Sequence, residues 1–75
     1  MGIAITAARL VRLLSQAGFR IIRQTGSHAH LERIGGIGKL VTIPMHAKDL
    51  SIVTLRSILR QAEIPMSDFL RMLGR

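Results

Sequence analysis

The sequence predicts an α+β domain in which helices cover one face of a three-stranded antiparallel sheet. Apolar residues recur at helical spacing near both ends of the chain, over residues 7–17 and 52–62. Between them, three short runs alternate apolar and polar residues and are separated by glycine-containing turns, as in a β-meander. Helices segregated to one face of such a sheet define the α+β class. Seventy-five residues leave no room for a second domain, so one domain is expected, residues 1–75.

The first helix is expected to begin after Thr6, a candidate N-cap, and to stop at Gly18. Its apolar stripe consists of Ala7, Leu10, Val11, Leu14 and Ala17. Arg9 and Arg12 share the opposite face, where they are either solvated or in contact with phosphates.

Two strands joined by a tight turn are expected next, over residues 19–24 and 28–34. In the first, Phe19 and Ile21 lie on one side and Arg20 and Ile22 on the other. Gly26 and Ser27 form the turn between the strands. If Ala29 and Leu31 face the core, then His28 and His30 stand on the opposite, wetter face.

The third strand and two further helices complete the predicted order α-β-β-β-α plus a short terminal helix. After the glycine-rich turn at residues 35–38, the strand at residues 39–44 points Val41 and Ile43 inward. The second helix follows Ser51, its expected N-cap, and Pro65 begins the third. The apolar stripes consist of Ile52, Leu55, Ile58, Leu59 and Ala62, and then of Met66, Phe69, Leu70 and Leu73. Double-stranded-RNA-binding domains (dsRBDs) share this order, an analogy at the level of fold.

The charge balance points to a polyanionic partner. Eleven Lys and Arg stand against four Asp and Glu, a formal net charge of +7, and no acid precedes Glu32. Nucleic acid, an anionic membrane surface or an acidic protein would all fit this excess, and solubility alone is the simpler explanation. The chain has no cysteine, no membrane-length apolar run and no signal peptide, since Arg9 and Arg12 interrupt that region. These absences predict a cytoplasmic protein that does not associate with membranes.

The order of several short motifs resembles that of the HicA (YcfA-like) mRNA interferase toxins of bacterial toxin–antitoxin systems. The matching segments are Ala17-Gly18-Phe19, Gly26-Ser27-His28, Val41-Thr42-Ile43-Pro44, His46, Lys48-Asp49-Leu50 and the run from Thr54 to Ala62. The sequence departs from the family at Glu63, where a glycine usually ends the helix, and at Val53, which replaces another common glycine. The glycine-rich turn also lacks the charged residues that the family usually has there.

The resemblance implies a dsRBD-like endoribonuclease that needs neither a metal nor any other cofactor, with the signature histidine, His28, as the catalytic residue. It also implies a cognate HicB-like antitoxin that covers the site. It does not settle what His30 or His46 does.

RNA cleavage suits these residue types, because each phosphodiester of RNA carries its own nucleophile, the adjacent 2′-OH. An imidazole, with an ordinary pKa of about 6.5, can accept that proton at neutral pH. The developing charge on phosphorus needs cationic donors. The candidate RNA-binding residues are Gly26, Ser27, Arg20, Arg23, Lys39 and Lys48. The sequence does not identify the general acid, the second group that would protonate the leaving oxygen.

Three alternatives share parts of this pattern. The first is a non-catalytic RNA-binding module with the same charge and fold. The second is a metal site at His28, His30 and Glu32, but at 3.3 Å per residue the first and last lie about 13 Å apart along a strand. The third is a membrane-surface role for the basic first helix, whose apolar stripe is also what the sheet needs for a core.

The chain has no Trp or Tyr and both Phe are expected to be buried, so RNA recognition should depend on phosphates and shape.

Overall fold

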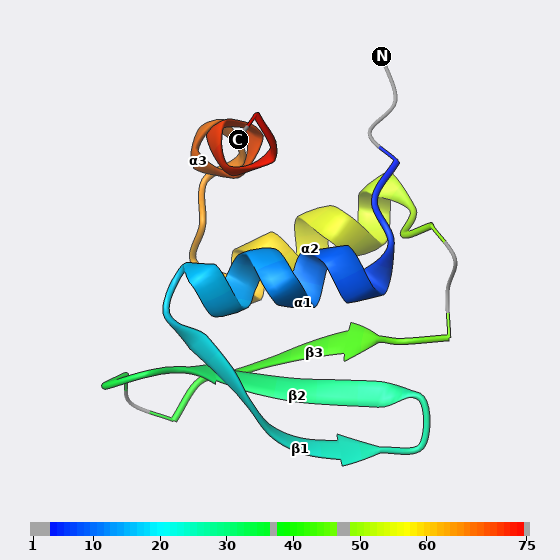
Figure 1. Ribbon diagram of the computed structural model, residues 1–75, viewed down its shortest axis with the longest axis vertical. Coiled ribbons are helices and arrows are strands. Elements are labelled where there is room, and N and C mark those ends of the chain that lie inside the picture. The colour runs from blue at the N-terminus through cyan, green and yellow to red at the C-terminus, as the bar shows by residue number, and fades with distance from the viewer. Residues whose placement is uncertain (1–3, 37, 47–48, 75) are drawn as a thin grey trace.

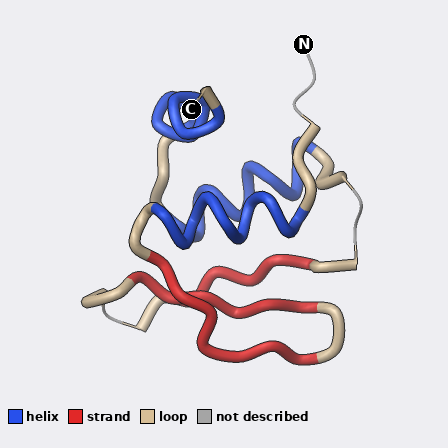
Figure 2. Tube along the Cα trace, viewed as in Figure 1, coloured by secondary structure: helices blue, strands red, loops and turns tan. Residues whose placement is uncertain are grey.

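The computed structural model describes residues 4–36, 38–46 and 49–74 and confirms the predicted α+β architecture (Figures 1 and 2). The elements are α1 (Ala7–Gln16), β1 (Phe19–Thr25), β2 (His28–Arg33), β3 (Leu40–Pro44), α2 (Ile52–Ala62) and α3 (Met66–Leu73). The strands form an antiparallel sheet in the order β1-β2-β3. Helices α1 and α2 cover one face of the sheet, and α3 lies beyond them on the side away from it (Figure 1). No helix in the described part of the chain is long and apolar enough to cross a bilayer.

The helices begin where short polar side chains satisfy their first amide groups. Thr6 Oγ1 accepts a hydrogen bond from the Arg9 amide, and Ser51 Oγ accepts one from the Thr54 amide, both at 3.1 Å. Both predicted N-caps are therefore confirmed. At the other end of α1, Gly18 has a φ of +98°, which glycine adopts without steric cost.

Helix α2 ends on a residue type that is uncommon in this conformation. Glu63 is its C-cap with a φ of 59°, in the left-handed region usually taken by glycine. Its carboxylate accepts a hydrogen bond from Lys39 Nζ at 2.5 Å. This hydrogen bond, and then the Lys39 charge, lower the pKa of Glu63. The helix end is thereby linked to the chain just before β3.

The core lies between the sheet and the two covering helices. Ala29, Leu31, Val41 and Ile43 point from the strands into it and are fully buried, as the alternation predicts. Leu10, Leu14, Leu55 and Ile58 complete its centre from α1 and α2, and Phe69 of α3 belongs to the same cluster of buried residues. The prediction that Ile52 is buried is wrong: it is 42% exposed, because it is the first residue of α2 and lies at the end of the covering layer.

A β-bulge interrupts the pairing of β1 with β2. Ile21 pairs with Leu31, but the next paired residue is Arg23, opposite His30, which leaves Ile22 as the extra residue. Simple alternation would place Arg23 on the helix-covered face with Ile21. Because residues directly opposite each other project to the same side, the bulge instead places Arg23 on the helix-free face with His30.

Helix α3 is expected to depend on Phe69, which is fully buried, whereas its neighbour Leu70 is 48% exposed. The prediction that Leu70 belongs to the buried stripe is wrong, because each residue along a helix is rotated by 100° from the one before and Leu70 leaves the buried face. Phe69→Ala should lower the free energy of unfolding by about 3–5 kcal/mol, comparable to all that a core of this size supplies. Leu70→Ala is the matched control and should cost about 1 kcal/mol or less. Urea unfolding followed by circular dichroism measures both, and equal losses would contradict this assignment.

Candidate active site

The turn that joins β1 to β2 has the predicted two-residue form. Thr25 and His28 are the last residues paired across it, with Gly26 and Ser27 between them. Gly26 has a φ of +56°, whereas Ser27 does not have a positive φ, which agrees with a type II′ hairpin turn. A glycine at this position lets the chain reverse within two residues and places His28 immediately after the turn.

His28 is exposed on the helix-free face of the sheet. Its neighbour Ala29 points into the core, so alternation turns His28 outward, as predicted. Opposite His28 lies Pro44, the last residue of β3. The pairing continues one residue further, because the Met45 amide donates a hydrogen bond to the Ser27 carbonyl at 2.5 Å. The turn and the end of β3 are therefore held together.

This arrangement brings a second histidine to the same place. His46 follows Pro44 by two residues and is exposed. Its ring centroid lies 6.2 Å from that of His28, with the ring planes at 66°. The sequence motifs include Pro44 and His46, but nothing in them connects His46 with His28. The signal that could have done so is the strand register, which places Pro44 opposite His28.

His30 is placed differently, between two threonines. Its Nε2 lies 2.9 Å from Thr25 Oγ1 on β1, and its Nδ1 lies 3.2 Å from Thr42 Oγ1 on β3. Both ring nitrogens are therefore hydrogen-bonded, and the residue is half-buried. These contacts favour a structural role in which His30 links all three strands.

The candidate cations are not gathered at one point. The helix-free face of the sheet carries His28 and His30 and is called the histidine face below. Arg23 lies opposite His30 on this face. Arg20 lies opposite Glu32 and forms an ion pair with it at 3.2 Å. Glu32 is four residues from His28, about 13 Å along the strand. Lys39 pairs with Glu63 at the end of α2, and Lys48 lies outside the described residues.

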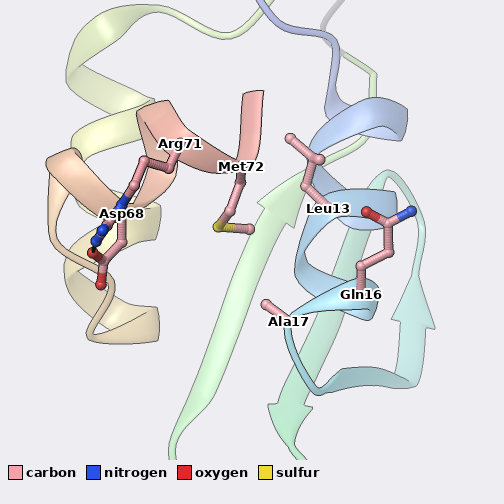
Figure 3. A pocket seen from close by; sticks show the side chains of 6 residues that line it. All are labelled: Leu13, Gln16, Ala17, Asp68, Arg71 and Met72. Atoms are coloured by element: carbon pink, nitrogen blue, oxygen red, sulfur yellow. Dashed lines mark hydrogen bonds and ion pairs between the residues drawn. The ribbon is translucent and has the colours of Figure 1, made fainter. Parts of the chain in front are cut away.

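A metal cluster and a groove are two other kinds of site to consider among the described residues. Within residues 4–36, 38–46 and 49–74, no group of three or more potential metal ligands comes together. A groove between the end of α1 and α3 is lined by Leu13, Gln16, Ala17, Asp68, Arg71 and Met72 (Figure 3). In it, Asp68 and Arg71 form an ion pair with each other across one turn of α3. The groove contains no histidine and belongs to the helical layer, so it is separate from the helix-free face of the sheet.

The fold and this surface define a small basic α+β protein with two exposed histidines at one end of an open sheet face. The family model described as HicA toxin of bacterial toxin–antitoxin matches residues 7–64. The chain therefore belongs to the HicA toxin family, and it is the toxin of a toxin–antitoxin system. The matched region contains all three strands, His28 and His46. A search among curated proteins finds no match.

Proposed function

We propose that this toxin is an endoribonuclease that cleaves RNA without a metal ion and uses His28 as its general base. The observation that carries the proposal is the exposed His28 imidazole, which follows the Gly26–Ser27 turn on the helix-free face of the sheet. Among the described residues its ring nitrogens have no hydrogen-bond partner, in contrast to those of His30. A strand of RNA can therefore approach the ring without displacing part of the fold.

The proposed reaction is an internal transfer at phosphorus. His28 removes the proton of the 2′-OH, and the 2′-oxygen forms a bond to the adjacent phosphorus. The bond from phosphorus to the 5′-oxygen breaks, and that oxygen leaves with a proton as a 5′-OH. The other product carries a 2′,3′-cyclic phosphate. Negative charge accumulates on the non-bridging oxygens of the phosphate. Arg23 is best placed to stabilise this charge, because it is the candidate cation on the same face of the sheet as the histidines.

The remaining proposed RNA contacts extend this site along the strand. Gly26 and Ser27 offer a turn against which the sugar–phosphate backbone can lie closely. Arg20, Lys39 and Lys48 would contact phosphates further from the cleaved bond. Since Phe19 and Phe69 are both buried, recognition should depend on phosphates more than on stacked bases.

Incubation of the purified protein with a labelled RNA tests this proposal directly. New 5′-OH ends that accumulate with time and with protein concentration are the expected result. A protein that binds the RNA at moderate salt but never shortens it would instead be a non-catalytic RNA-binding module, and the proposal would be wrong.

We infer that the antitoxin is an acidic, HicB-like protein that occludes His28 and the basic residues around it. A surface that attracts RNA through its +7 net charge also attracts an acidic protein, so the two ligands should compete. Arg20, Arg23 and Lys39 are the expected contacts. Binding should weaken as salt rises, because exposed charges are screened over about 8–10 Å near physiological ionic strength.

The competition is measured with a fluorescent RNA and increasing amounts of antitoxin. Saturating antitoxin should release the RNA, and Arg23→Gln should weaken both complexes. Arg60→Gln, which removes one charge from the exposed face of α2, is the matched control and should weaken the RNA complex less. Simultaneous binding of both ligands with unchanged affinities would contradict occlusion.

A further inference from the structure

The proposed reaction still lacks a proton donor for the leaving oxygen. His28 accepts one proton when the 2′-oxygen attacks, and the 5′-oxygen must gain another as its bond to phosphorus breaks. A single imidazole cannot do both at once. His46 is the imidazole whose ring lies beside that of His28, with 6.2 Å between the ring centroids.

The fold holds the two rings near each other through backbone contacts. Pro44 pairs with His28, and the Met45 amide donates to the Ser27 carbonyl at 2.5 Å. His46 is the next residue after this hydrogen bond, so its position relative to the turn is restrained. Both histidines are exposed, which leaves the space around the rings open to a ligand.

The other nearby imidazole is less suited to proton transfer. His30 has a threonine hydroxyl on each ring nitrogen, at 2.9 and 3.2 Å, and is half-buried. To protonate a leaving group it would have to give up a contact that links two strands. His46 makes no such contact among the described residues. No described carboxylate forms an ion pair with His28 or His46.

We propose that His46 is the general acid of the cleavage reaction, a role that rests on the ribonuclease activity proposed above. The imidazolium of His46 donates its proton to the 5′-oxygen while the neutral imidazole of His28 accepts the proton of the 2′-OH. A proton donor or acceptor must come within about 2.6–3.2 Å of its oxygen. The 2′- and 5′-oxygens are bonded to one phosphorus in the transition state, and two rings 6.2 Å apart can reach oxygens of a single phosphate group.

The test compares leaving groups that differ in their need for a proton. One RNA has a normal linkage at a single cleavable position, and the other has sulfur in place of the bridging 5′-oxygen there. A thiolate leaves without protonation, so loss of a general acid should matter much less for the sulfur-linked RNA. His46→Gln should cleave the normal RNA about 10²-fold or more slowly than the parent and recover most of that loss on the sulfur-linked RNA.

Two other variants make the comparison specific. His28→Ala should be slow on both RNAs, because the 2′-OH still needs a base. Arg60→Gln, on α2 and away from the histidine face, should cleave both at close to the parent rate. The rate of the parent should fall on both sides of an optimum pH, and His46→Gln should lose the fall on the alkaline side, where the acid would otherwise be deprotonated. Circular dichroism confirms that each variant is folded.

The outcomes separate the two proposals. If the parent cleaves the normal RNA and His46→Gln cleaves it equally fast, His46 is not the general acid, although the ribonuclease activity stands. If His46→Gln is slower than the parent by the same factor on both RNAs, the acid role is wrong as well, because the loss does not depend on the leaving group. His46 would then act in binding or positioning. A parent that cleaves neither RNA overturns the ribonuclease activity and the role of His46 together.

Discussion

His28→Ala is expected to reduce RNA cleavage by about 10²–10⁴-fold and to abolish toxicity when the protein is expressed in cells. The variant loses the proposed base for the 2′-OH, and Arg23 cannot take its place because a guanidinium remains protonated. The fold should be intact, since His28 is exposed and makes no hydrogen bond to the described residues. Single-turnover cleavage of a labelled RNA measures the loss, and growth after induction measures toxicity.

The controls for His28→Ala distinguish chemistry from folding and binding. The unfolding midpoint of the variant in urea should stay close to that of the parent, and the variant should still bind RNA. His28→Gln keeps a polar side chain of similar reach and should be nearly as inactive, because an amide does not accept a proton at neutral pH. A folded His28→Ala protein that cleaves as fast as the parent would rule out His28 as the base.

An RNA with a single 2′-deoxy substitution is expected to resist cleavage completely at the substituted position. Deoxyribose lacks the nucleophile of the proposed reaction, so no rearrangement of the protein can restore it. Cleavage at neighbouring, unmodified positions should continue at the normal rate and serves as the internal control. Gel analysis of the fragments shows which bonds have been cut.

The same substrates test whether the reaction needs a metal ion. Addition of EDTA should leave the cleavage rate of the unmodified RNA unchanged, because the proposed reaction uses only protein side chains and the 2′-OH. Cutting at the deoxy position would mean that water attacks phosphorus instead. Loss of activity in the chelator, restored by a divalent cation, would point to a metal-dependent reaction.

The features that were predicted correctly from the sequence are local ones. Thr6 and Ser51 begin helices because their side chains accept hydrogen bonds from amides only three residues away. Alternation within β2 places Ala29 in the core and His28 on the opposite face, because side-chain direction in a strand repeats every two residues. Each of these features depends on residues close together in the chain, so the sequence contains the full information for them.

Features that depend on pairing between distant segments were decided by the tertiary structure. The bulge at Ile22 moves Arg23 onto the histidine face, and an insertion of this kind is set by the match between β1 and β2. Lys39 pairs with Glu63, which caps the end of α2 and lies 24 residues further along the chain. Neither result follows from the local pattern of either segment.

In the candidate site, the position of His28 is a local feature, whereas the position of His46 depends on strand pairing. The chain itself determines that His28 follows a tight turn and points away from the core. Only the register of β2 against β3 places Pro44 opposite His28 and so brings His46 to it. His46 follows His28 by eighteen positions, and nothing in the sequence between them specifies the distance between their rings. That distance arises from strand pairing, which is stabilised by hydrogen bonds and core contacts across the whole sheet.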